Sequence, residues 1–158
     1  MKKLPLLLLA TCLFTCHSPS PDTAALQARI DGLEKKLSET YKPGFGEFMS
    51  SIQVHHEKLW FAGQHGNWKL ADFEIHEIME AIEGIETYET DREESKQIGM
   101  IKPVVDSVAK AIEAQNLPLF KSSFVHLTNT CNDCHRAVGF EFNQVKMPET
   151  PPFSNQVF

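Results

Sequence analysis

Residues 71–85, with the sequence ADFEIHEIMEAIEGI, carry the pattern that decides the fold. Apolar side chains recur along this stretch in alternating steps of four and three residues, at Ala71, Ile75, Ile78, Ile82 and Ile85. The spacing follows the 3.6-residue period of an amphipathic helix and departs from the two-residue period of a strand. Because Asn67 is placed to cap its start, the pattern predicts a helix that continues to about Tyr88.

The same period recurs on both sides of this stretch and predicts further helices over residues 45–63, 91–112 and 116–138. Asp91 and Glu94 have the spacing of a capping box, and Pro103 requires the helix that follows them to kink or restart. Asn116 suits the start of the last helix and Gly139 suits its end. Amphipathic helices with short connections favour an all-α fold, an antiparallel up-down-up-down four-helix bundle over residues 44–142.

An extra N-terminal helix is predicted ahead of the bundle, over Thr23 to Thr40. Its apolar residues fall at a/d spacing: Leu26, Ile30, Leu33 and Leu37. Residues 17–43 thus comprise a polar, Pro-rich tether followed by this helix. At the other end, residues 143–158 form a Pro-rich tail that is not expected to continue the helical pattern.

Composition limits the class of protein. The 158 residues are 42% hydrophobic and 23% charged, which is typical of one ordinary globular domain. Fifteen Lys and Arg against 21 Asp and Glu give a net charge of −6, so nucleic acid is not expected as a partner. No nucleophile–base pair, phosphate-binding loop or pair of catalytic carboxylates stands out, so we do not expect an independent enzyme.

Residues 1–16 have the form of a signal peptide with a lipobox. Met1-Lys2-Lys3 is basic, and the apolar run over residues 4–14 is too short to span a bilayer. The segment Leu13-Phe14-Thr15-Cys16 resembles a bacterial lipobox, with Thr15 where Gly, Ala or Ser is usual. We therefore expect a periplasmic or other extracytoplasmic protein, lipid-anchored to a bacterial membrane through Cys16, with ordinary signal-peptidase cleavage as the alternative.

Residues 131–135, CNDCH, form a C-x-x-C-H haem-attachment sequence. The thiols of Cys131 and Cys134 are expected to form thioethers with one covalently bound haem c per chain, and His135 to ligate its iron from the proximal side. A disulfide, a thioredoxin-like redox site and a zinc site are the alternatives. The small loop between the two cysteines disfavours a disulfide, and their position near a helix C-terminus disfavours a thioredoxin-like site. The lack of further Cys ligands in the domain disfavours a zinc site.

A four-helix bundle with C-x-x-C-H on its last helix resembles the class II c-type cytochromes, which include cytochrome c′ and its low-spin, Met-ligated relatives. The resemblance covers Gly44 to Phe142, and its only specific motif is the one at residues 131–135. It implies either a carrier of one electron between redox proteins or, where the distal face of the iron is open, a protein that binds NO or CO. A helical interaction lipoprotein without haem is a third interpretation.

Met49 is the expected distal iron ligand. It lies about one turn from the start of its helix, level with His135 near the end of the antiparallel last helix, and the resemblance points to the same place. His56 is the rival, but at 1.5 Å per residue it lies roughly 10 Å deeper than Met49 and better suits a porphyrin edge or a core hydrogen bond. An ordinary core methionine at Met49 stays open, as does homodimer formation.

The remaining histidines are expected on solvated or rim-facing surfaces: His55, His65, His76 and His126. The pair His76 and Glu80 would suit a metal-binding bundle only if other helices supplied matching ligands. The aromatic residues are expected to form the bundle core and the wall of the haem pocket: Trp60, Phe61, Phe73, Phe120 and Phe124.

Overall fold

The structure, a computed structural model, describes residues 21–40 and 43–158. The expected signal peptide, its lipobox and Cys16 lie outside the described residues. The chain divides between residues 41 and 42 into two units. All regular structure within the described ranges is helical, as the sequence predicts.

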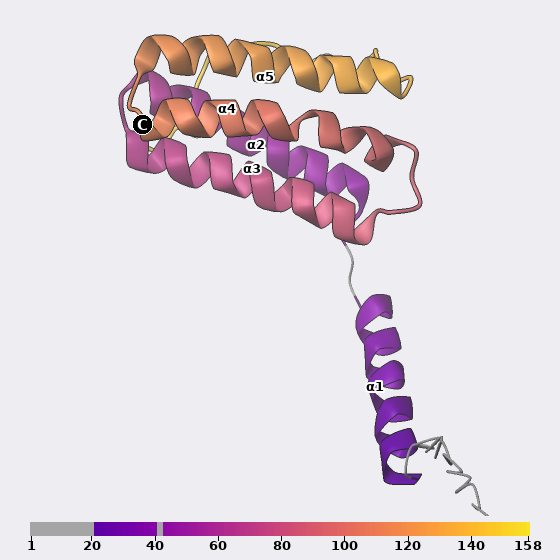
Figure 1. Ribbon diagram of the computed structural model, residues 1–158. Coiled ribbons are helices and arrows are strands. Elements are labelled where there is room, and N and C mark those ends of the chain that lie inside the picture. Colours follow the sequence, from indigo (N-terminus) through magenta and orange to yellow (C-terminus); the bar gives the residue numbers. More distant parts are fainter. Residues whose placement is uncertain (1–20, 41–42) are drawn as a thin grey trace, which may run out of the picture. The chain divides into compact units, whose positions relative to one another are not determined.

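The second unit contains four α-helices and a short 3₁₀ segment (Figure 1). In chain order these are α2 (Phe45–Gln64), α3 (Trp68–Tyr88), the 3₁₀ segment η1 (Glu94–Met100), α4 (Lys102–Glu113) and α5 (Leu117–Ala137). Helix α2 packs against α3 and α5, and α4 packs against the same two helices. The first unit contributes α1 (Pro21–Glu39).

The predicted start and stop signals set most helix ends. The Asn67 side chain accepts a hydrogen bond from the Leu70 backbone N–H at 3.3 Å, and that of Asn116 accepts one from Leu119 at 3.0 Å. Pro103 lies in the first turn of α4, where its missing N–H costs no helical hydrogen bond, so the helix restarts there as predicted. Gly139 follows α5 with a φ of 77°, a left-handed conformation that favours glycine.

The capping box predicted at Asp91 and Glu94 is wrong. Glu93, not Asp91, precedes η1, and no side chain caps that segment. The Glu94 carboxylate instead accepts a hydrogen bond from the Arg92 guanidinium at 2.7 Å. Because Arg92 also lies over the Phe45 ring, at 5.1 Å from its centroid, this pair ties the connection between α3 and α4 to the start of α2.

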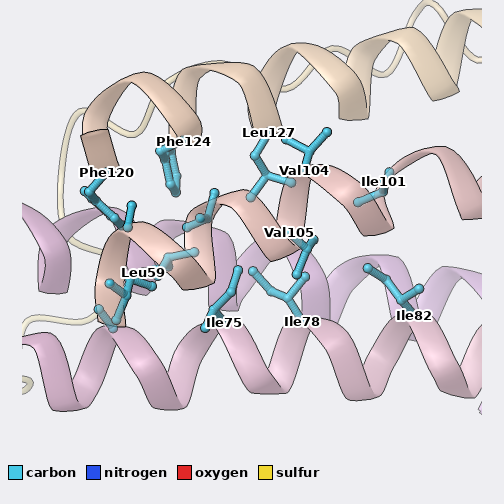
Figure 2. Close-up of a cluster of buried hydrophobic side chains, with 14 of the residues drawn as sticks. Leu59, Ile75, Ile78, Ile82, Ile101, Val104, Val105, Phe120, Phe124 and Leu127 are labelled. Carbon is cyan, nitrogen blue, oxygen red and sulfur yellow. The ribbon is translucent and has the colours of Figure 1, made fainter. Parts of the chain in front are cut away.

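The core fills the space between the four helices (Figure 2). Ile75, Ile78 and Ile82 of α3 are at most 2% exposed, so the face predicted from residues 71–85 is the buried one. Phe61, Phe120 and Phe124 are buried as predicted. The prediction for Phe73 is wrong because that residue lies on the opposite side of α3, where its side chain is 52% exposed.

The tail after α5 forms no helix, as predicted, but it packs along the bundle (Figure 1). Met147 and Phe158 lie half-buried against the core, and the Phe158 ring lies 5.7 Å from that of Phe61 near the end of α2. The tail therefore returns from the end of α5 to the end of α2.

Helix α1 forms the first unit and exposes all four of its large apolar side chains. The ion pair between Lys35 and Glu39, at 3.8 Å, lies along one side of it. Among the described residues, no helix combines the length and the apolar character needed to cross a membrane.

Candidate cofactor site

A cavity of about 270 Å³ opens where the start of α2, the segment η1 and the end of α5 meet. This volume is close to the lower end of the range for small-molecule sites, roughly 300–1,000 Å³. Met49 of α2 lines it, together with Cys131, Cys134 and His135 of α5. The structure thus brings to one cavity all the described residues that the sequence analysis assigned to a cofactor.

Helix α5 divides the five residues of the CNDCH motif between two sides. Cys131, Cys134 and His135 are spaced by three and one residues and line the cavity. Asn132 turns toward the tail, and Asp133 is exposed and pairs with Arg136 on the outside of the helix. The three side chains with affinity for a porphyrin or its iron therefore share one surface.

The His135 imidazole has a defined orientation. Its Nδ1 lies 2.5 Å from the backbone carbonyl oxygen of Asn143 in the tail. A carbonyl oxygen only accepts hydrogen bonds, so Nδ1 carries the hydrogen and the neutral ring keeps its lone pair on Nε2. A histidine bonded in this way is prepared to ligate a metal through Nε2.

Asn132 holds the segment of tail that supplies this carbonyl. The side-chain amide donates to the Val145 carbonyl oxygen and accepts from the Val145 N–H, both at 2.8 Å. Asn132 is only 8% exposed and Val145 is half-buried, so these two hydrogen bonds are partly shielded from water. The sequence analysis did not predict this contact, because an asparagine in a helix gives no signal for a partner in an irregular tail.

Both thiols of the motif are free and protonated. Burial, with a smaller effect of Cys134, raises the pKa of Cys131 to about 12, and burial also raises the pKa of Cys134. A thioredoxin-like cysteine requires the opposite, a thiolate stabilised near neutral pH. The environment of these thiols therefore disfavours the redox alternative.

Met49 lies half-buried about one turn into α2. The start of that helix is fixed because the Gly44 backbone N–H donates to the Glu47 carboxylate at 2.9 Å. Met49 and His135 come from different helices but line the same cavity. Their side chains could therefore contact opposite faces of a flat group bound there.

His56 also reaches the cavity, although it is only 3% exposed. Its Nε2 lies 2.9 Å from the Thr128 hydroxyl of α5, which is the core hydrogen bond expected for it. The hydroxyl in turn donates to the Phe124 carbonyl at 3.1 Å, so His56 is the donor to Thr128. Burial lowers the pKa of His56 to about 4, and the ring is neutral at pH 7.

The predicted aromatic wall is wrong in position. Trp60, Phe120 and Phe124 pack together and Phe61 packs against Phe158, and none of these rings lines the cavity. The aromatic side chains that do line it are Phe45 and Phe140, alongside aliphatic residues of α3, η1 and α5. The walls are therefore mainly apolar, with polar side chains such as Gln53 and Glu94 among them.

Three of the other histidines are exposed as expected: His65, His76 and His126. His55 differs, because its Nδ1 lies 2.6 Å from the carboxylate of Glu74 on α3. Glu74 is fully buried, and Lys58 lies 3.6 Å from its other oxygen. The sequence analysis missed this cluster, which joins α2 to α3.

The alternative of a metal-binding bundle, suggested by the pair His76 and Glu80, finds no support in the described part of the chain. His76 lies 3.6 Å from the Asp72 carboxylate on the exposed side of α3. Over residues 21–40 and 43–158, no group of three or more His, Cys, Asp or Glu side chains is arranged to hold a metal ion.

Comparisons with family models, with curated proteins and with solved structures gave no match for this chain. The resemblance to class II c-type cytochromes therefore rests on residues 131–135 and on the helical arrangement around them. The function has to be inferred from the chemistry of the cavity.

Proposed function

We propose that this chain is a monohaem c-type cytochrome that carries one electron between redox protein partners. One observation carries the proposal: Cys131, Cys134 and His135 line a single cavity, and Met49 faces them from another helix. In this proposal the two thiols would hold haem c through thioethers, and His135 and Met49 would ligate its iron.

We further infer an antiparallel up-down-up-down bundle of α2 to α5, with α1 as an additional helix. The packing of α2 on α3, α3 on α4, α4 on α5 and α5 on α2 supports this topology. The arrangement places the start of α2 beside the end of α5, the two segments from which the axial ligands would come.

Haem iron, when bound, supplies the one-electron chemistry. The chain's own residues orient and shield the group. The Asn143 carbonyl keeps the proton of His135 on Nδ1, so that Nε2 is available as a ligand. The walls are mainly apolar and a neutral His56 adds no charge to them, while the Glu94 carboxylate that also lines the cavity is paired with Arg92. A thioether ligand and a dry environment both favour the reduced iron, so a higher potential than with two histidine ligands is expected.

The proposal includes export and attachment to the membrane. The basic start, the short apolar run and the lipobox-like sequence ending at Cys16 support a lipid-anchored extracytoplasmic protein. Covalent haem attachment by a C-x-x-C-H motif is consistent with that compartment.

The proposal is tested by expressing the chain with export and haem-maturation systems. The denatured protein should keep its colour after acid–acetone extraction, because thioethers survive that treatment. Cys131→Ala combined with Cys134→Ala should abolish the colour. Colourless wild-type protein from a competent host would refute the proposal.

Met49→Ala separates electron transfer from gas binding. With Met49 as a ligand, the wild-type ferrous protein should not bind CO, while the variant should bind it and lose the thioether–iron band at the red end of the ferric spectrum. Met79→Ala, at a half-buried methionine that does not line the cavity, is the matched control. If the wild-type protein already binds CO and Met49→Ala changes nothing, a gas-binding protein with an open distal face replaces the electron carrier.

A further inference from the structure

Helix α1 carries an apolar stripe that the haem proposal does not use. Its four large side chains are 46–74% exposed: Leu26, Ile30, Leu33 and Leu37. A single helix of 19 residues is only marginally stable in water, and an exposed stripe of this kind is usually covered by a partner.

The stripe has the register of a coiled coil. Its steps of four, three and four residues place Leu26 and Leu33 at d positions, and Ile30 and Leu37 at a positions. Of the two a positions, Ile30 is β-branched, and both d positions are leucine; β-branched residues at a with leucine at d favour two parallel strands. Gly32, the weak point of the helix, falls at the outward-facing c position, where it does not interrupt the seam.

The charges beside the stripe select a second copy of the same helix in parallel orientation. Arg29 falls at a g position and Glu34 at the e position five residues later, which are the two positions that face each other between parallel, in-register chains. An antiparallel pair would instead bring the g-position cations, Arg29 and Lys36, toward one another. The ion pair of Lys35 with Glu39 occupies the outer f and c positions and does not compete.

We propose that α1 helices of two copies of this chain form a parallel, in-register coiled coil, in which Arg29 of each copy pairs with Glu34 of the other. The seam is short, so association depends on concentration. A shared membrane surface would raise the local concentration and hold both helices in the same direction. The dimer does not require haem, so the result of a test for dimer formation is independent of the result for the proposed function.

Cysteine cross-linking of the full exported chain in intact membranes tests this interface. Leu26→Cys, near one end of the seam, should give a disulfide-linked dimer on mild oxidation, because identical d positions meet only in a parallel, in-register pair. Ala28→Cys, at the outward-facing f position of the same turn, is the matched control and should remain monomeric. The unsubstituted chain corrects for its own cysteines.

Charge reversal supplies a second readout. Adding Arg29→Glu to Leu26→Cys should lower the yield of cross-linked dimer several-fold, because the new carboxylate would face that of Glu34 in the other copy. Adding Glu34→Arg as well should restore the yield of dimer. Equal cross-linking of Leu26→Cys and Ala28→Cys would overturn the proposal. So would an Arg29→Glu variant that cross-links as well as its parent, or preferential linking of Leu26→Cys to Leu37→Cys, which indicates an antiparallel pair.

Discussion

Replacing Asn132 with alanine should release the tail from α5. The substitution removes both hydrogen bonds to Val145, each 2.8 Å long and formed by a side chain only 8% exposed. At a net value of about 0.5–1.5 kcal/mol for each bond, the tail should lose about 1–3 kcal/mol of docking free energy. Opening of the tail should then become roughly 5- to 150-fold more frequent.

Amide hydrogen exchange of the folded protein measures this opening. Val145 and its neighbours should exchange faster in Asn132→Ala by that factor, while the amides of α3 keep their protection. Asn132→Asp keeps the acceptor for the Val145 N–H but loses the donor, so it should show an intermediate effect. Asn155→Ala, at an exposed asparagine of the same tail, is the matched control.

The same substitution should change the His135 ring. In the haem-free protein, once the tail is released, the Asn143 carbonyl no longer fixes the hydrogen on Nδ1, and ¹⁵N shifts should show a growing fraction of the Nε2–H tautomer. Unchanged exchange at Val145 in Asn132→Ala would refute the reasoning about the tail. Faster exchange with an unchanged His135 tautomer would refute the link from the tail to the imidazole.

Two further substitutions probe the core. Gly63→Ala should lower the free energy of unfolding by about 1–3 kcal/mol, because the new Cβ would lie 2.2 Å from the buried Phe120 ring. Gly46→Ala is the control and should be neutral or slightly stabilising, because nothing lies within 4 Å of the new Cβ. Thermal unfolding of the two variants measures the difference. Burial lowers the pKa of His56 to about 4, so its contribution to stability is complete above pH 6.5 and is lost as the pH falls toward 4, by about 3 kcal/mol. His56→Gln should therefore show less acid destabilisation than the parent protein in denaturant titrations at pH 7 and pH 4, and equal losses would contradict the lowered pKa.

Local signals in the sequence were sufficient for most helix ends, but the helix predicted from Asp91 is a 3₁₀ segment over Glu94–Met100 and α4 begins only at Lys102. Asn67, Asn116, Pro103 and Gly139 act on neighbouring backbone groups, so their effects can be predicted without knowledge of the tertiary structure. The capping box at Asp91 failed for the opposite reason. Its glutamate is engaged by Arg92, whose position also depends on the Phe45 ring of another helix.

The polar contacts of the site could not be predicted in the same way. No periodicity in the tail indicates that Val145 meets Asn132 or that the Asn143 carbonyl meets His135. A carboxylate in an amphipathic helix is expected to face water, and Glu74 is buried only because α2 brings His55 and its neighbours to it. Such contacts depend on how the helices pack, which one-dimensional patterns do not specify.

The proposed ligands in the cavity come from the first and last helices of the bundle, α2 and α5, which has a consequence for the order of folding. Met49 and His135 are separated along the chain by all of α3 and α4, so the contacts that close the cavity carry a larger loop-closure cost than those between α2 and α3. Before α5 docks, the thiols of Cys131 and Cys134 are open to water; afterwards burial holds the pKa of Cys131 at about 12. If haem is attached as proposed, attachment to these thiols is therefore expected on the incompletely folded chain. Substitutions that accelerate docking of α5 should then reduce the yield of haem-bound protein without reducing its stability.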